Sequence, residues 1–347
     1  MTVNDKEAPY QPSWIDRFSH WVETLPVRSW LFHAVFGLAL ILVQILFLWL
    51  DGGLDAGELL PVIIFNGLAI PFLLALIQLL DNQAVSALDA MRPVLDMSEE
   101  AVGQAEYRLA NMPFLGPLLA GLVTTALTIL TPLWTAEPVR YAALEQLPVF
   151  AVVFHIVDKG SAFLFGVVLY HTVRQLRLVN TINLNHVRIN LFHLRPLRAF
   201  SKLTASTALG LLIFVYLWMF INPELLTDPL IVGYALLFTA LAVVVFVWPL
   251  WGAHRLMQTE KEKALHEIDL RLEAAFSKFN HMFQEDDYAA TERLNGVIAS
   301  LETQYERINA IPTWPWSSET ARLALTAIAL PLILMIIQYF VLQALDR

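Results

Sequence analysis

The residues best suited to chemistry inside a membrane are three ionisable side chains within one long apolar stretch. The stretch from Phe150 to Arg174 is long enough to cross a bilayer, and it contains His155, Asp158 and Lys159. A charge at the bilayer centre costs about 2.5–3.5 kcal/mol on insertion scales, so ionisable groups at that depth often mark ion or proton pathways. Because His155 precedes the other two by three and four residues, all three can share part of one helix face. They form a candidate intramembrane polar cluster. The alternative is a structural pair, Asp158 with Lys159, near the outer end of the span.

A second candidate site is the basic strip between residues 175 and 202. Its cations alternate with apolar residues, a pattern typical of a helix that lies among lipid headgroups. The strip predicts contact with anionic lipids, although the same cations are also an ordinary excess of positive charge on the cytoplasmic side. The predicted contact residues are Arg177, Arg188, Arg195, Arg198 and Lys202.

Cofactor and catalytic signatures are weak or missing. His33 and His171 lie toward the cytoplasmic ends of two predicted spans, and paired histidines on facing helices can ligate a b-type haem. Two histidines near a polar interface are nevertheless common without a cofactor, so we expect no cofactor and no metal. The chain has no cysteine and none of the patterns HExxH, GxSxG, Walker A or GxGxxG. We therefore expect no enzymatic activity.

The composition indicates an all-α polytopic membrane protein. Of the 347 residues, 57% are hydrophobic and only 15% are charged, whereas a soluble domain has about 25% charged residues. Six or seven apolar runs reach the roughly 20 residues that a spanning helix needs. The net charge of −9 argues against a nucleic acid partner, because binding to phosphates requires a basic face.

The apolar runs divide the chain into four parts. We predict an amphipathic cytoplasmic lead over residues 1–28, a transmembrane bundle over 29–252 with cytoplasmic loops at 81–113 and 175–202, a cytoplasmic helical hairpin over 253–316, and a last transmembrane helix over 317–347. The fourth of the seven expected spans has an uncertain beginning, between about residue 147 and Lys159. The hairpin is predicted because apolar residues recur at helical spacing on both sides of the polar sequence QEDDY (284–288).

The distribution of cations predicts the orientation. Nineteen of the 22 Lys and Arg residues fall in the lead and in residues 81–113, 174–202 and 253–322, whereas the loops at 51–58 and 222–229 have none. Because cytoplasmic loops carry the excess of Lys and Arg, this alternation places the N-terminus in the cytoplasm and the C-terminus outside.

Two stretches resemble segments of uncharacterised polytopic membrane proteins of prokaryotes. They are INLFHLRPLRAFSKLTASTALG (189–210) and IPTWPW (311–316). The resemblance covers about a tenth of the chain. It implies a prokaryotic plasma membrane and supplies no activity and no functional residues.

Two functions remain open at this point. The first is a multi-pass cell membrane scaffold or sensor that acts through 253–310, with membrane lipids and either a cytoplasmic protein or a second copy as partners. The alternative is an ion or proton channel or transporter that uses the polar cluster. In that case polar residues of other spans should converge on the fourth span, with Gln44, Asn66, Thr124, Thr128 and Gln338 as candidates.

Overall fold

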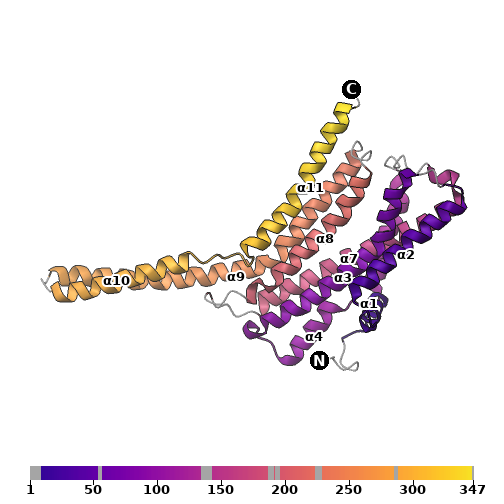
Figure 1. Ribbon diagram of the computed structural model, residues 1–347. Coiled ribbons are helices and arrows are strands. Elements are labelled where there is room, and N and C mark those ends of the chain that lie inside the picture. Colours follow the sequence, from indigo (N-terminus) through magenta and orange to yellow (C-terminus); the bar gives the residue numbers. More distant parts are fainter. Residues whose placement is uncertain are drawn as a thin grey trace.

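The protein is all-α, as its composition predicts. The computed structural model describes residues 9–53, 57–133, 143–186, 191, 196–222, 229–284 and 288–345. These residues form ten α-helices and five short 3-10 turns, and their one β-bridge joins Pro12 to Pro113. Figure 1 shows a bundle of long helices from which a thin helical arm extends to one side.

Six helices are long and apolar enough to cross a membrane, among the residues that the structure describes. This confirms the expectation of several spans. The predicted seventh span falls on α11 (Ser318–Leu345), which is helical but is not among those six, so the total of seven stays a prediction. The six helices are α2 (Ser29–Leu50), α3 (Leu60–Met91), α5 (Leu115–Leu130), α7 (Pro148–Asn185), α8 (Ala199–Ile221) and α9 (Pro229–Gln284).

Two helices continue far into segments that the sequence assigned to loops. Helix α3 continues to Met91, into the predicted loop 81–113, and α7 continues to Asn185, into the predicted loop 175–202. Residues 175–185 therefore continue α7 and bury Leu176, Val179 and Ile182 in the protein core, whereas contact of this segment with headgroups stays a prediction. Since α7 is one helix from Pro148 onward, no helix boundary falls at Lys159 within the described residues.

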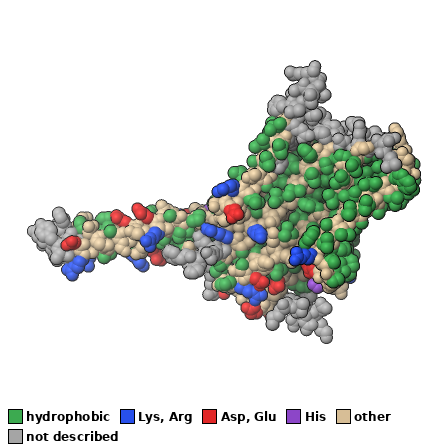
Figure 2. Space-filling model, in the orientation of Figure 1, with side chains coloured by type: hydrophobic (Ala, Val, Ile, Leu, Met, Phe, Trp, Pro, Cys, Tyr) green, Lys and Arg blue, Asp and Glu red, His purple; other side chains and the backbone are tan. Residues whose placement is uncertain are grey.

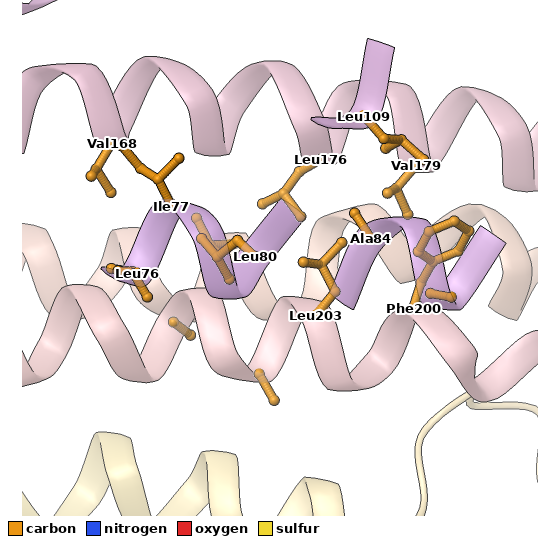
Figure 3. Packing of buried hydrophobic residues seen from close by; sticks show 14 of the residues in the cluster. Leu76, Ile77, Leu80, Ala84, Leu109, Val168, Leu176, Val179, Phe200 and Leu203 are labelled. Atoms are coloured by element: carbon orange, nitrogen blue, oxygen red, sulfur yellow. The ribbon is translucent and has the colours of Figure 1, made fainter. Parts of the chain in front are cut away.

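Helix α3 is the axis of the bundle. In its most apolar window 56% of the residues are buried, compared with 11% for α5, so α5 lies at the periphery. The main core joins α3 to α7, α8, α9 and the short helix α4 (Glu99–Ala110). In Figure 3 the α3 side chains Leu76, Ile77, Leu80 and Ala84 lie between apolar side chains of α7 and α8. Where such helices lie in lipid, close van der Waals packing and interhelical hydrogen bonds hold them together, because lipid tails are as apolar as the buried side chains.

Helix α5 is held against α7 by a close approach at Gly166. A Cβ atom at Gly166 would lie 2.5 Å from the Ala120 carbonyl oxygen. At the same place the Thr124 hydroxyl donates to the Ala162 carbonyl at 2.9 Å. Small residues permit this kind of close contact between membrane helices.

Replacing Gly166 with Ala should therefore detach α5 from α7. We expect a loss of about 1–3 kcal/mol from overpacking, because the opposing atom belongs to the backbone and cannot rotate away. Thermal unfolding of the purified protein measures the loss. Gly233→Ala is the matched control, since no atom lies within 4 Å of its Cβ position and Ala is the better helix former. Equal stability of the two variants would contradict the close approach.

The predicted lead contains a helix whose one face packs on the bundle and whose other face is exposed. Helix α1 (Trp14–Thr24) buries Ile15 and Val22, and its Trp14 and Phe18 contact the main core. Trp21 remains 51% exposed. The amphipathic helix of the lead is thus present, but most of its apolar face is covered by the bundle.

The arm consists of residues 256–310. The C-terminal part of α9 packs there against α10 (Tyr288–Asn309) around a small separate core, and both helices extend away from the bundle in Figure 1. The predicted tip 284–288 lies mostly outside the described residues. Members of this core are Ile268, Ala275, Ile298, Leu301 and Ile308, with Leu191 packed beside them.

The segment 311–316 packs on α9. Trp314 stacks on His254 and on Trp316, and Trp316 stacks on Phe246, with ring centroids 3.9, 4.3 and 5.2 Å apart. These contacts hold the segment against α9 at the point where the chain leaves the arm and enters α11.

Candidate functional site

The structure brings together two of the three residues of the predicted intramembrane cluster. The Lys159 ammonium lies 2.9 Å from the Asp158 carboxylate on α7, and the two side chains are 31% and 27% exposed. His155 is exposed, with its ring against the edge of Phe154. Adjacent charges at this distance neutralise each other, so their partial burial costs less than that of two isolated ions.

The polar residues expected to converge on this pair instead bind the spans to one another. Asn66 of α3 donates to the Gln44 side chain of α2 and to the Phe154 carbonyl of α7, both at 3.1 Å. Thr124 donates to α7, whereas Thr128 bonds within its own helix. The side chain of Gln338 lies outside the described part of the chain. Within the described ranges, no hydrogen bond joins another span to the side chains of the ion pair.

The predicted lipid contacts are scattered along the described chain. Arg177 and Lys202 are exposed on α7 and α8, as a lipid contact requires. Arg198 is half-buried at the start of α8, and its Nε atom is buried without a hydrogen-bond partner among the described residues. Arg188 and Arg195 lie outside the described residues.

A close contact between a histidine and a carboxylate, which the sequence did not predict, joins α3 to α7. His171 is fully buried on α7, and its Nε2 atom lies 2.8 Å from the carboxylate of Asp81 on α3. Gln175, one turn further along α7, donates to the Leu109 carbonyl of α4 at 3.0 Å. The pair therefore lies where three helices meet. Burial of this kind is tolerated only when each charge has a partner.

A second buried acid, Asp16, attaches the lead to the bundle beside this pair. Asp16 accepts hydrogen bonds from the Ser13 hydroxyl, the Ser13 amide and the Met112 amide at 2.8–2.9 Å. Ser13 and Asp16 form the capping box that begins α1, and the Ser13 amide also donates to the Met112 carbonyl. The same residues thus start the helix and attach it to the end of α4.

Arg174 completes the attachment from α7. Its guanidinium donates to the Tyr10 hydroxyl and to the Arg108 carbonyl, and Tyr107 donates to the Tyr10 carbonyl at 2.6 Å. We name Tyr10, Asp16, Asp81, His171 and Arg174 the junction cluster. It holds two carboxylates, one guanidinium and one imidazole, so it is electrically neutral when His171 is protonated.

Burial raises the pKa values of the two junction-cluster residues that belong to the lead, Asp16 and Tyr10. Burial raises the pKa of the Asp16 carboxyl above its usual range, and the hydrogen bonds from Met112 and Ser13 act in the opposite direction. Burial also raises the pKa of Tyr10 to about 12 against the opposing charge of Arg174, so Tyr10 stays a neutral donor. The carboxyl groups and the imidazole of this cluster can share a proton, and their contacts join the lead to α3, α4 and α7.

Each histidine of the predicted pair has an oxygen of α3 beside its Nε2 atom. The Nε2 atom of His171 lies 2.8 Å from the Asp81 carboxylate, and that of His33 lies 3.3 Å from the Gln78 side chain. The Nδ1 atoms of both rings are buried without a hydrogen-bond partner among the described residues. In the described ranges no three His, Cys, Asp or Glu side chains gather as a metal site. That the protein has no cofactor stays a prediction.

The sequence does contain a sign of the junction cluster, namely ionisable residues in or beside apolar runs, but His171 was considered only as a haem ligand. Asp81 directly follows an apolar run of α3, and His171 lies within the apolar run of α7, both toward the end of the bundle on which the lead packs. Their separation of 90 positions in the sequence hides their contact, because spacing along a chain reveals only neighbours on one helix.

Comparison with family models, curated proteins and solved structures finds no match to this chain. The function is therefore argued from the helices, their buried polar contacts and the arm.

Proposed function

We propose that this protein is a non-enzymatic scaffold or sensor of the cell membrane that acts through its arm. In this proposal the chain crosses the membrane seven times, with α11 as the last span and the N-terminus in the cytoplasm. The arm then lies in the cytoplasm and carries the contact with a partner helix, either of another protein or of a second copy. The cation distribution supports this orientation.

The observation that carries the proposal is the continuity of α9. This helix runs over 56 residues from Pro229, through the bundle, to Gln284 in the arm. It contains Pro249, which removes one backbone hydrogen bond and can bend a helix, and the stacked tryptophans of 311–316 brace the chain beside that position. In this proposal a displacement of α9 among the spans moves the base of the arm with it, because the helix continues through Pro249 into the arm.

The arm has the sequence spacing of a two-stranded antiparallel coiled coil. Apolar residues at 265, 268, 272, 275 and 279 of α9, and at 294, 298, 301, 305 and 308 of α10, alternate in steps of three and four. Leu270, Phe276 and Val297 point outward and are 46–52% exposed. Exposed apolar side chains beside a paired seam support the addition of further helices.

Removal of the arm tests this proposal. The Lys261 ammonium donates to the Asn309 and Ile311 carbonyls at 2.5 and 3.1 Å, so the two strands of the base lie side by side. Deleting residues 264–306 and joining the ends with a short Gly-Ser linker should preserve this base. We expect the oligomer or the co-purified partner to be lost while the spans still insert. An unchanged assembly state by light scattering, with no partner lost, would contradict the proposal.

A conducting protein is the second candidate, and the half-buried Asp158–Lys159 pair favours it. The pair follows by one helical turn the Phe154 carbonyl that Asn66 binds, so polar groups of three spans lie near one another. Under this alternative, D158L/K159L should abolish ion flux into liposomes. The exposed pair Asp89 and Arg92 provides the control D89L/R92L. Flux that survives the first double change would eliminate transport through this pair.

A further inference from the structure

An open groove lies between α8 and α11. Its cavity is about 810 Å³ and its walls are almost entirely apolar. Such a volume lies within the range of sites for small ligands, about 300–1,000 Å³. Figure 2 shows hydrophobic side chains over this face of the bundle, around α11. Residues along the two walls include Leu212, Tyr216 and Phe220 of α8 and Leu323, Ala327 and Leu334 of α11.

A more polar cavity adjoins the end of the groove at which α11 begins. This second cavity, of about 740 Å³, shares the lining residue Ser318 with the groove and is lined by Arg198, Lys261 and residues 309–314 and 316–318. Arg322 and Glu319, in the first turns of α11, line the groove itself. Figure 2 shows basic side chains where the arm leaves the bundle. Three cations and one acid thus line the two adjoining cavities.

These cations have hydrogen-bonding capacity that the described protein does not use. The Nε atom of Arg198 is buried without a partner, and no described acid forms an ion pair with Arg198 or Arg322. Lys261 places two of its three N–H groups on carbonyls. A buried donor left unpaired costs about 1–3 kcal/mol, so an acceptor from outside the described chain would relieve it.

The groove is longer than one leaflet of a bilayer. Its α11 wall runs from Ser318 to Leu334, about 24 Å at 1.5 Å per residue, and its α8 wall runs from Leu209 to Phe220, one residue before α8 ends. Half of a hydrocarbon core of about 30 Å is about 15 Å. The groove therefore extends beyond the depth of one leaflet and has room for an extended acyl chain along its length.

We propose that the α8–α11 groove binds one anionic phospholipid, with an acyl chain along the apolar walls and the phosphate among Arg198, Lys261 and Arg322. The charge balance favours an anion, and the apolar walls favour a hydrocarbon chain over a free phosphate. The site differs from general attraction to the basic strip, because Arg322 and the groove lie outside that strip. It rests on the membrane location of the bundle and not on the role of the arm.

Native mass spectrometry of the full chain in a neutral detergent tests the site. The probes are phosphatidylglycerol and phosphatidylcholine with identical acyl chains. We expect one phosphatidylglycerol per chain, bound at least roughly tenfold more tightly than phosphatidylcholine, because each nearby cation contributes about fivefold to anion binding. Equal binding of the two lipids would overturn the proposal.

Charge variants separate this site from the rest of the basic surface. R198Q/R322Q should lose about twentyfold in phosphatidylglycerol affinity, whereas R177Q/K202Q, which removes two exposed cations outside both cavities, should leave it unchanged. E319Q removes the one acid of the mouth and should tighten binding about fivefold. This gain keeps the test decisive if the double Arg variant fails to fold. Loss of affinity in R177Q/K202Q alone, or no gain in E319Q, would contradict the site.

Two further measurements distinguish a lipid from other occupants. Filling the groove with A327W should weaken phosphatidylglycerol binding, and millimolar inorganic phosphate should not displace the lipid. Displacement by phosphate together with full binding in A327W would overturn the lipid site in favour of an anion site. A dimer that covers the groove and excludes lipid would overturn it as well. Deletion of 264–306 should leave lipid binding intact, so failure of the scaffold proposal and failure of this one are separable.

Discussion

Replacing Ile268 and Ile298 together with Asp should unfold the arm while the spans remain folded. Both side chains are only 5% exposed, and they belong to the seam between α9 and α10. An unpaired carboxylate in such a seam costs several kcal/mol, and the arm has no other core from which to compensate. Hydrogen exchange should show loss of protection over α10 and the arm part of α9, by about a hundredfold or more for several kcal/mol. Amides of α3 should stay protected.

Matched controls lie beside both positions. Leu270 and Val297 are 52% and 50% exposed on the outer faces of the same helices. L270D/V297D introduces the same two charges where water can solvate them, so the arm should stay folded. If L270D/V297D unfolds the arm as completely as I268D/I298D, the unfolding results from the added charge and not from loss of the seam. If neither variant changes exchange, α9 and α10 do not pair in solution.

Breaking the buried pair of His171 and Asp81 should produce the largest loss of stability in the bundle. Removal of one partner of a buried pair costs about 3–5 kcal/mol, because the other partner stays buried without compensation. We expect H171L or D81L to lower the free energy of unfolding by this amount and to expose α1 to proteolysis, since the lead packs over the pair. Replacing both residues with Leu should restore part of the loss. The double-mutant cycle then gives a coupling energy of about 2 kcal/mol or more between the two sites.

The exposed pair of Arg92 and Asp89 is the reference for this cycle. Its charges are 2.8 Å apart, like those of the buried pair, but the side chains are 43% and 54% exposed. Surface pairs contribute about 0–1 kcal/mol, so D89L should change stability little. Equal losses in D81L and D89L would mean that burial of His171 contributes nothing to the junction cluster.

The apolar runs were sufficient to predict the class of the protein and most of its spans. Leu73, Ile77 and Leu80 belong to the long apolar run of α3. Such a run predicts a spanning helix by its length and composition alone, without knowledge of its tertiary contacts. The start of α4 follows an ordinary capping rule, since the Ser98 side chain accepts from the Ala101 amide.

The extensions of α3 and α7 were missed for a physical reason. Three consecutive polar residues, Asp81, Asn82 and Gln83, end the apolar run of α3, so the span was predicted to end there and the following residues were assigned to a loop. Yet Ala84, Leu88 and Met91 recur at steps of three and four and are buried. A single buried stripe on a mostly polar helix is sufficient for packing against protein, although it is too narrow for contact with lipid all round.

The candidate sites were predicted less completely, because they depend on contacts between distant helices. Asp158 and Lys159 are neighbours in sequence, and their pairing could be predicted. The contact of Asp81 with His171 and the joining of Arg198, Lys261 and Arg322 at two cavities depend on how α3, α7, α8, α9 and α11 pack together. No periodicity within one segment contains that information.

The sidedness of two introduced cysteines tests the central claim most directly, because the chain has no cysteine of its own. Gly57 precedes α3 and Gly296 lies in the arm, and at both positions an added side chain would meet no atom within 4 Å. In intact cells a membrane-impermeant thiol reagent should label Gly57→Cys, and it should label Gly296→Cys only after the membrane is opened. Labelling of both cysteines from the same side would contradict a bundle that crosses the membrane with its arm in the cytoplasm.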